Sequence, residues 1–183
     1  YASRGNKLYN AIVEAAYMTS FERNGDVIIM ASYAPLLAKK DFTQWNPDLI
    51  YFDNTSIVPT PNFYVQKMFM TNQGDYYFGN VVKMRDDDKL LAASCVQDSK
   101  SGDVIVKLVN VHNSVKPMEV DLSQFKKLGK KAVLTVISGD PEDVNSFDNP
   151  KHIASRESEM NVSKSFTYQA PAMSLSVIRI KTK

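Results

Sequence analysis

The sequence predicts a mainly β protein, an antiparallel β-sandwich of jelly-roll type preceded by a short helical unit. Two observations lead to this fold class. Up to Gly74, apolar residues recur at helical spacing and alternate with loops. Beyond Gly74, short segments rich in β-branched residues follow one another with Gly or Asp clusters between them, a pattern typical of antiparallel sandwiches. We therefore predict a boundary near Asp75, with one unit over residues 1–74 and another over 75–183.

The elements of the first unit have the order expected at the end of an α/β barrel. Asn6 to Glu22 contains neither Pro nor Gly and has apolar residues on more than one side, which predicts a buried helix ended by Asn24-Gly25. Val27 to Ala31 is continuously apolar, which predicts a strand covered on both faces. Thr60-Pro61 then opens a second helix that runs to about Thr71. The unit is thus predicted as a helix–strand–helix remnant of a (β/α)8 barrel.

The second unit is predicted to consist of short strands joined by turns. Ser99 to Asp103 predicts a hairpin turn. Residues 174–180 alternate approximately between apolar and polar types, which predicts a half-buried final strand. The other predicted strands are Leu90–Val96, Val104–Val111, Met118–Leu122 and Ala132–Ile137.

Composition excludes several classes of partner. Of the 183 residues, 44% are hydrophobic and 23% are charged, as in ordinary globular proteins. A net charge of +2 leaves no electrostatic footprint for nucleic acid. No apolar run approaches the ~20 residues that span a bilayer. The single cysteine, Cys95, excludes an internal disulfide and is expected to be a small buried hydrophobic residue.

Three blocks of the first unit, in this order and spacing, carry a family resemblance. They are Phe21–Leu37, Trp45–Asn54 and Thr60–Phe69. Together they resemble the C-terminal portion of the α-L-arabinofuranosidases of glycoside hydrolase family 51. The resemblance continues more weakly through Asn145–Pro150 and Ser174–Ile180.

The resemblance implies that the catalytic residues lie upstream of this chain. In that family the nucleophilic Glu ends the seventh barrel strand and is followed by an aromatic residue and Ala, and this chain opens with Tyr1-Ala2. The acid/base Glu lies further upstream. The chain also has no initiator Met and no signal peptide, so we expect its start to be a cut. The parent protein would then release terminal non-reducing arabinofuranose from arabinan or arabinoxylan with retention, and this portion alone would be inactive.

The carboxylates of the first unit do not form a catalytic pair in the sequence. A retaining glycosidase needs two carboxyl groups about 5–5.5 Å apart. Glu14 falls in the middle of a predicted helix, and Glu22 falls at the wrong end of a barrel, where a structural pair with Arg23 or a cap is favoured. Asp48 and Asp53 fall nearer the correct face, but neither has a partner at a suitable spacing. We expect no catalytic residue here.

Three residues are candidates for binding substrate. Tyr33 ends the predicted barrel strand and should face the active-site mouth. Trp45, the only tryptophan, could stack on a sugar ring, or it could pack its loop against the barrel. Asn46 could bond a sugar hydroxyl, or it could form an Asx turn.

We expect neither a cofactor nor a metal site. His112 and His152 lie far apart in the second unit, and the sequence places no Ser, Asp or metal-ligand grouping around either of them. Both are interpreted as structural or surface residues.

Two alternative roles are open for the sandwich, carbohydrate binding and structural support. The sandwich could bind carbohydrate through Tyr76–Phe78, although consecutive strand residues face opposite sides. It could instead have a structural role, which we favour for this chain alone. The expected partners are an arabinose-containing polysaccharide, bound by the missing barrel, and a second copy of the chain. Self-association is expected through exposed Leu8, Ile12, Tyr64 and Met68, and the alternative is that this segment is partly non-native. A periplasmic or secreted location is favoured over a cytoplasmic one.

Overall fold

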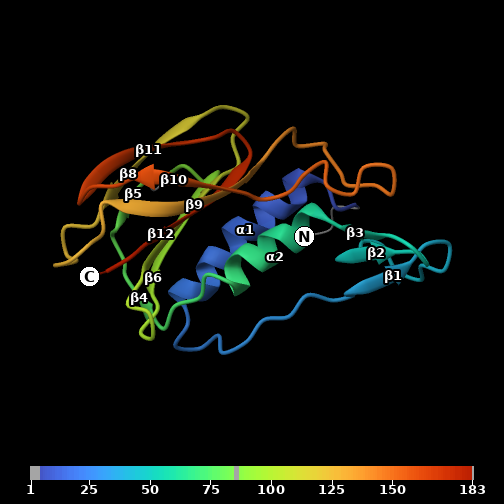
Figure 1. The fold of residues 1–183 in the computed structure, drawn as a ribbon, viewed down its shortest axis with the longest axis horizontal. Coiled ribbons are helices and arrows are strands. Elements are labelled where there is room, and N and C mark those ends of the chain that lie inside the picture. Colours follow the sequence, from blue (N-terminus) through green and yellow to red (C-terminus); the bar gives the residue numbers. More distant parts are fainter. Residues whose placement is uncertain (1–4, 85–86, 183) are drawn as a thin grey trace.

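The computed structural model describes residues 5–84 and 87–182 and arranges them in three layers (Figure 1). Two helices cover one face of a six-stranded sheet, and a three-stranded sheet covers its other face. A separate small sheet lies beside the helices, away from the sandwich (Figure 1). The opening residues Tyr1 to Arg4, on which the expected junction with the catalytic barrel rests, lie outside the described residues.

Both helices precede residue 74, and the long strands follow it. In chain order the elements are α1 (Leu8–Arg23), β1 (Leu37–Lys39), β2 (Ile50–Phe52), β3 (Ile57–Pro59), α2 (Pro61–Met70), β4 (Tyr76–Tyr77), β5 (Val82–Lys83), β6 (Leu91–Gln97), β7 (Val104–Asn110), β8 (Lys116–Asp121), β9 (Lys131–Ser138), β10 (Arg156–Asn161), β11 (Ser165–Ala170) and β12 (Ser174–Ile180).

The central sheet is antiparallel throughout, and its middle strands β7 and β12 are buried on both faces. Its strand order is β10-β9-β12-β7-β6-β4, and the smaller sheet has the order β11-β8-β5. In β7, Ile105 and Val109 face the helices, whereas Val106 and Leu108 face the smaller sheet. The two cores thus lie on opposite sides of the same strands. The predicted fold class, a mainly β antiparallel sandwich, is confirmed.

The four strands predicted between residues 90 and 137 are confirmed as β6 to β9, and the predicted hairpin turn joins β6 to β7. Gly102 in this turn has a φ of +76°, and a Cβ there would lie 2.7 Å from the Thr182 hydroxyl oxygen. Both facts require glycine at this position.

The final strand, β12, is almost completely buried, so its prediction as half-buried was wrong. Its serines do not face water. The Ser174 hydroxyl donates a hydrogen bond to the Pro171 carbonyl (2.7 Å), and the Ser176 hydroxyl accepts one from the Tyr168 phenol (3.0 Å). Such small polar residues can be buried because each hydroxyl has a partner.

The sequence did not predict β10 and β11. Both are edge strands whose residues are mostly exposed, so they lack the apolar pattern by which buried strands are recognised. Their backbone groups nevertheless pair over six residues each, with β9 and β8 respectively.

Both predicted helices are confirmed. The first backbone N–H groups of α1 have partners outside the helix, because Leu8 donates to the Asp143 carbonyl (2.9 Å) and Tyr9 to the Pro141 carbonyl (3.0 Å). The Thr60 hydroxyl caps α2 by accepting a hydrogen bond from the Phe63 N–H (3.3 Å).

The strand predicted for Val27–Ala31 does not form in this structure. Ile29 and Met30 are 87% and 85% exposed. A strand needs neighbours for its backbone hydrogen bonds, and the described residues place none beside this segment. The apolar run predicts burial, but the described residues include neither a strand that pairs with this segment nor side chains that cover it.

The four residues predicted to form an exposed self-association surface are buried. Leu8, Ile12, Tyr64 and Met68 all belong to the core between the helices and the central sheet. The prediction was wrong because the sandwich itself covers these helix faces, with α1 packing on β6, β7 and β12. The boundary near residue 75 remains a prediction, although this core draws side chains from both sides of it.

A buried lysine ties the helices to the sheet. Lys107 of β7 is fully buried, and its ammonium donates to Glu22 Oε1 (2.6 Å) at the end of α1 and to the Asn72 carbonyl (2.7 Å) just beyond α2. The ammonium also lies 5.3 Å from the centre of the Phe69 ring. Burial lowers the pKa of Lys107, and Glu22 opposes this shift. The sequence had assigned Glu22 to a pair with Arg23 or a cap; its ion-pair partner is Lys107 instead.

Lys107→Met should lower the free energy of unfolding by about 3–5 kcal/mol, because it leaves the Glu22 carboxylate at the layer boundary without its partner. Lys131→Met is the matched control, since the Lys131–Glu159 pair (2.9 Å) is exposed and its loss should leave stability nearly unchanged. Denaturant unfolding of both variants measures the difference. Equal, small losses would contradict a bridging role for Lys107.

Cys95 should not react with a disulfide reagent in the folded protein. The side chain is buried, as predicted, and burial raises the pKa of its thiol to about 12. At pH 8 only about one thiol in ten thousand would then be a reactive thiolate. Colour release from Ellman's reagent before and after unfolding in guanidinium chloride tests this. A fast reaction without denaturant would show that the core opens near Cys95.

Candidate substrate-binding loop

The candidate substrate-binding loop comprises residues 40–49 and joins two parallel strands of the small sheet. Leu37 pairs with Ile50 in register, and the pairing extends backwards through the Leu49 N–H, which donates to the Pro35 carbonyl (3.2 Å). Because β1 and β2 are parallel, Tyr33 and Asn46 each stand four residues before a paired position. Both segments therefore enter the small sheet from the same end.

Asn46 is held by a short hydrogen-bonded turn within the loop. The Tyr51 hydroxyl donates to Asn46 Oδ1 (2.9 Å) and accepts from the backbone N–H of Asp48 (3.0 Å). Burial raises the pKa of Tyr51, so its phenol stays protonated and able to donate. Tyr51 organises this turn, yet nothing in the sequence separates it from an ordinary strand tyrosine.

Trp45 projects from the loop. Its side chain is 71% exposed, and within residues 5–84 and 87–182 the indole makes no hydrogen bond and no aromatic ring contact. An exposed indole ring can stack on the apolar face of a sugar. Tyr33 is half-buried and already has an interaction partner. Trp45 precedes Asn46 in the chain, but no hydrogen bond or ring contact joins the Trp45 side chain to Asn46 or Tyr33 in the described part, so their joint role in binding stays a prediction.

The Glu14 and Asp53 carboxylates of the first unit are committed to structural contacts. Glu14 accepts hydrogen bonds from Asn62 (2.6 Å) and Gln66, and burial raises its pKa. Asp53 accepts from the backbone N–H groups of Thr55 (2.8 Å) and Ser56 (2.7 Å), and the Thr55 N–H holds its pKa below the usual value.

Asp48 is the exception among these carboxylates. It is buried, burial raises its pKa, and its Oδ2 finds no hydrogen-bond partner among the described residues. Its backbone carbonyl accepts from Asn6. Buried carboxylates normally have hydrogen-bond partners, so Asp48 Oδ2 is an acceptor whose partner is missing among the described residues.

Each histidine is paired with an aspartate, which the sequence interpretation missed. His112 Nε2 lies 2.9 Å from Asp88 Oδ1, and His152 Nε2 lies 2.9 Å from Asp143 Oδ1. The bond from His152 lowers the pKa of Asp143. Both pairs join loops of the sandwich, and no His, Cys, Asp or Glu cluster of metal-binding size occurs among the described residues.

Tyr76 to Phe78 do not form a flat sugar-binding surface. Tyr76 is 59% exposed, whereas Phe78 packs into the second core, where its ring centre lies 4.7 Å from that of Phe125. The strand β4 ends at Tyr77, and Phe78 beyond it turns into the core, so the three rings do not share one exposed face.

Comparison with known proteins identifies the family. The family model described as "Alpha-L-arabinofuranosidase C-terminal domain" matches residues 2–174. A probable α-L-arabinofuranosidase A from Aspergillus oryzae is 34% identical over 174 residues, which are 93% of this chain and 26% of the relative. An extracellular exo-α-L-arabinofuranosidase from Streptomyces chartreusis is 55% identical over 75 residues, 41% of this chain and 9% of the relative. This chain thus spans about a quarter of the fungal relative.

Solved structures agree with this match. An arabinose-bound GH51 α-L-arabinofuranosidase superposes with a TM-score of 0.92 and 35% identity, covering 98% of this chain and 28% of that one. The arabinose complex of the Thermotoga maritima enzyme, at 16% identity, has the same fold, with a TM-score of 0.78 and coverage of 99% and 41%. No described helix is long and apolar enough to cross a membrane. The chain belongs to the α-L-arabinofuranosidase C-terminal domain family.

Proposed function

We propose that this chain is the C-terminal part of an α-L-arabinofuranosidase that removes terminal non-reducing arabinofuranosyl residues from arabinan or arabinoxylan. The observation that carries the proposal is the family match over residues 2–174, together with 34% identity to a fungal protein of that name. In this proposal two Glu residues upstream of the chain act as nucleophile and acid/base, and hydrolysis proceeds with retention. The extracellular designation of the Streptomyces relative supports a secreted or periplasmic location.

Two features of the first unit support its place in a larger barrel. Residues 27–37 expose a strip of apolar side chains, among them Val27, Ile29 and Met30. Close to the helices, the buried oxygens Asn6 Oδ1 and Asp48 Oδ2 have no partners among the described residues. Apolar strips and unpaired buried acceptors of this kind need covering groups. We propose that the remaining barrel strands supply them, and that the isolated chain would self-associate through the same strip.

The sandwich then has a structural role. Its central sheet buries one whole face of α1 and α2, so it fixes the helices that would flank the last barrel strand. The rival role as a carbohydrate-binding module through Tyr76–Phe78 is disfavoured by the inward position of Phe78.

The protein that carries this chain should release arabinose from an aryl α-L-arabinofuranoside, and the chain alone should not. The expected difference arises because the proposed acid and nucleophile are upstream. Spectrophotometric release of the phenol measures turnover, and proton NMR of the first-formed sugar identifies its anomer. Inversion would contradict the retaining mechanism, and turnover by the pure chain would contradict the upstream position of the pair.

Trp45→Ala should lower kcat/KM of that protein by roughly tenfold without changing stability. Loss of one aromatic stacking contact is worth about 0.5–1.5 kcal/mol beyond burial, and an exposed indole contributes little to folding. Phe42→Ala is the matched control, because Phe42 is another exposed aromatic residue of the same loop. If both variants keep native kinetics, Trp45 does not contact substrate.

A further inference from the structure

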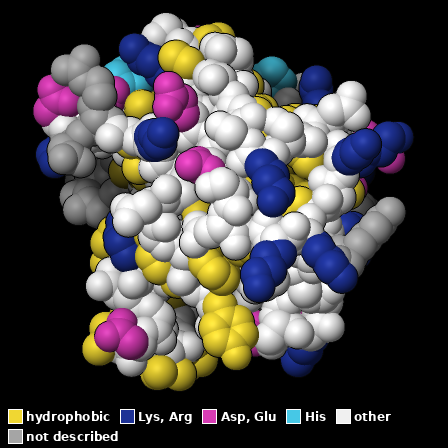
Figure 2. All heavy atoms as spheres, turned by 90° about the vertical axis from the view of Figure 1, so that its left-hand side faces the viewer, with side chains coloured by type: hydrophobic (Ala, Val, Ile, Leu, Met, Phe, Trp, Pro, Cys, Tyr) yellow, Lys and Arg dark blue, Asp and Glu magenta, His cyan; other side chains and the backbone are white. Residues whose placement is uncertain are grey.

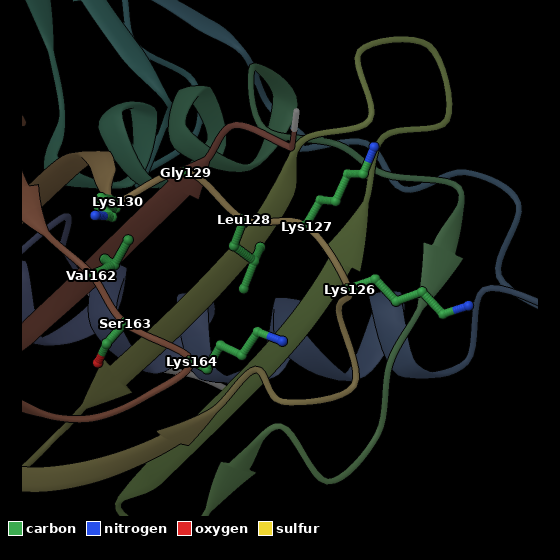
Figure 3. Close-up of a pocket in the computed structure, with 8 residues that line it drawn as sticks. All are labelled: Lys126, Lys127, Leu128, Gly129, Lys130, Val162, Ser163 and Lys164. Carbon is green, nitrogen blue, oxygen red and sulfur yellow. The ribbon is translucent and has the colours of Figure 1, made fainter.

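A lysine-lined hollow of about 490 Å³ lies at one end of the sandwich (Figure 3). Two connections between the sheets meet there. The connection from β8 to β9 contributes Lys126, Lys127 and Lys130, and the connection from β10 to β11 contributes Lys164. None of these residues belongs to the candidate substrate-binding loop.

The hollow is built on a fixed backbone. The Val162 N–H donates to the Lys130 carbonyl (2.9 Å), which joins the two connections directly. The Leu122 N–H donates to the Lys164 carbonyl (2.6 Å), and the Gly129 N–H donates to the Lys181 carbonyl (2.7 Å). Leu128 and Val162 pack against the second core. The lysines therefore extend from a backbone that these hydrogen bonds and apolar contacts hold in place.

The positive charge of the hollow is not neutralised by the protein. The four lysines are exposed and form no ion pair within the described residues. Nearby acids have other partners: Glu159 pairs with Lys131 (2.9 Å), Asp103 pairs with Arg179 (2.7 Å), and Asp121 accepts a hydrogen bond from the Ser123 N–H (2.9 Å). Figure 2 looks onto this end of the molecule and shows basic side chains gathered on one half of it, with few acidic ones between them.

The arrangement fits a polymer with repeated charges better than a single anion. The four lysine side chains in Figure 3 point in different directions and do not converge on one point. The lining contains no Arg, so it lacks the fork that binds phosphate in a bidentate manner. It also contains no aromatic residue on which a nucleic-acid base could stack. Ammonium groups spaced along a hollow suit single carboxylates along a chain.

We propose that this hollow binds uronic-acid residues of an acidic polysaccharide, with each lysine pairing with a carboxylate of the polymer. The polysaccharide would be held at the sandwich while its arabinose side groups reach a separate active site. The carbohydrate nature of the polymer rests on the proposed function, but the binding itself does not require catalysis. An experiment can therefore show that the binding proposal is wrong without testing the arabinofuranosidase activity, and the reverse.

The test compares two sets of four substitutions in the protein that carries this chain. The hollow variant combines Lys126→Gln, Lys127→Gln, Lys130→Gln and Lys164→Gln. The control variant removes four exposed lysines elsewhere, by Lys67→Gln, Lys83→Gln, Lys100→Gln and Lys151→Gln. Both variants lose the same total charge, so a difference between their affinities shows that the position of the lysines matters.

Binding is measured by calorimetric titration with polygalacturonate at low and high salt, and with uncharged linear arabinan. At roughly twofold per exposed charge contact, the hollow variant should bind polygalacturonate about tenfold more weakly than the control variant and show a smaller salt dependence. Turnover of an aryl arabinofuranoside should be the same in both variants. If only the proposed activity is wrong, turnover will be absent while the difference in polygalacturonate binding remains.

Three results would overturn the proposal. The unmodified protein could fail to bind polygalacturonate, or the control variant could be weakened as much as the hollow variant. Equal affinity for a single-stranded oligonucleotide of the same charge would indicate a non-selective polyanion surface. Denaturant unfolding of each variant checks that the changes act on binding and not on folding.

Discussion

The burial of one ammonium group constrains how the layers of this protein fit together. A lysine enclosed in a core needs a carboxylate and further acceptors to offset its lost hydration. Lys107 finds them in Glu22 and in the Asn72 carbonyl, which belong to the ends of two different helices. The three groups meet at one position of β7, so α1 and α2 are held in one orientation over the central sheet. The core between helices and sheet is otherwise mainly apolar, and further polar contacts anchor the helices at their ends.

A sheet covered on both faces explains which strands the sequence revealed. In β7 every residue is buried and five of the seven are apolar, so the strand lacks the alternation of polar and apolar residues that a half-exposed antiparallel strand shows. The abundance of β-branched residues predicted this strand but did not show which side chains face the helices and which face the smaller sheet. The edge strands β10 and β11 have one neighbour each and are mostly exposed, and their polar sequences gave no signal. For Val27–Ala31 the apolar run predicted a buried strand, which does not form in this structure because the described residues place no partner strand beside it.

The sequence proposed the candidate loop but not its internal contacts. The family resemblance and the residue types of Trp45, Asn46 and Tyr33 suggested it, Trp45 is exposed in the structure, and the role of the loop in binding stays a prediction. The Tyr51 hydroxyl, which holds Asn46, became apparent only in the fold, because a tyrosine near a strand is usually a packing residue. The histidine–aspartate pairs were missed for a related reason. The members of the His112–Asp88 pair are 24 residues apart, and spacing along the chain carries no information about such a contact.

The blocks that carry the family resemblance contain groups that join the layers rather than groups that perform chemistry. The Thr60 hydroxyl caps α2 and also donates to the Leu49 carbonyl (2.7 Å). The Asn145 amide donates to the Pro59 carbonyl (2.7 Å), which ties a sandwich loop to the entrance of α2. Arg179 of β12 bonds Asp103 (2.7 Å) and the Thr71 carbonyl (3.3 Å) at the exit of the same helix. Both ends of α2 are thus anchored to the sandwich. A unit without the catalytic pair can therefore still carry a recognisable family sequence, because the geometry of the helix layer depends on these contacts.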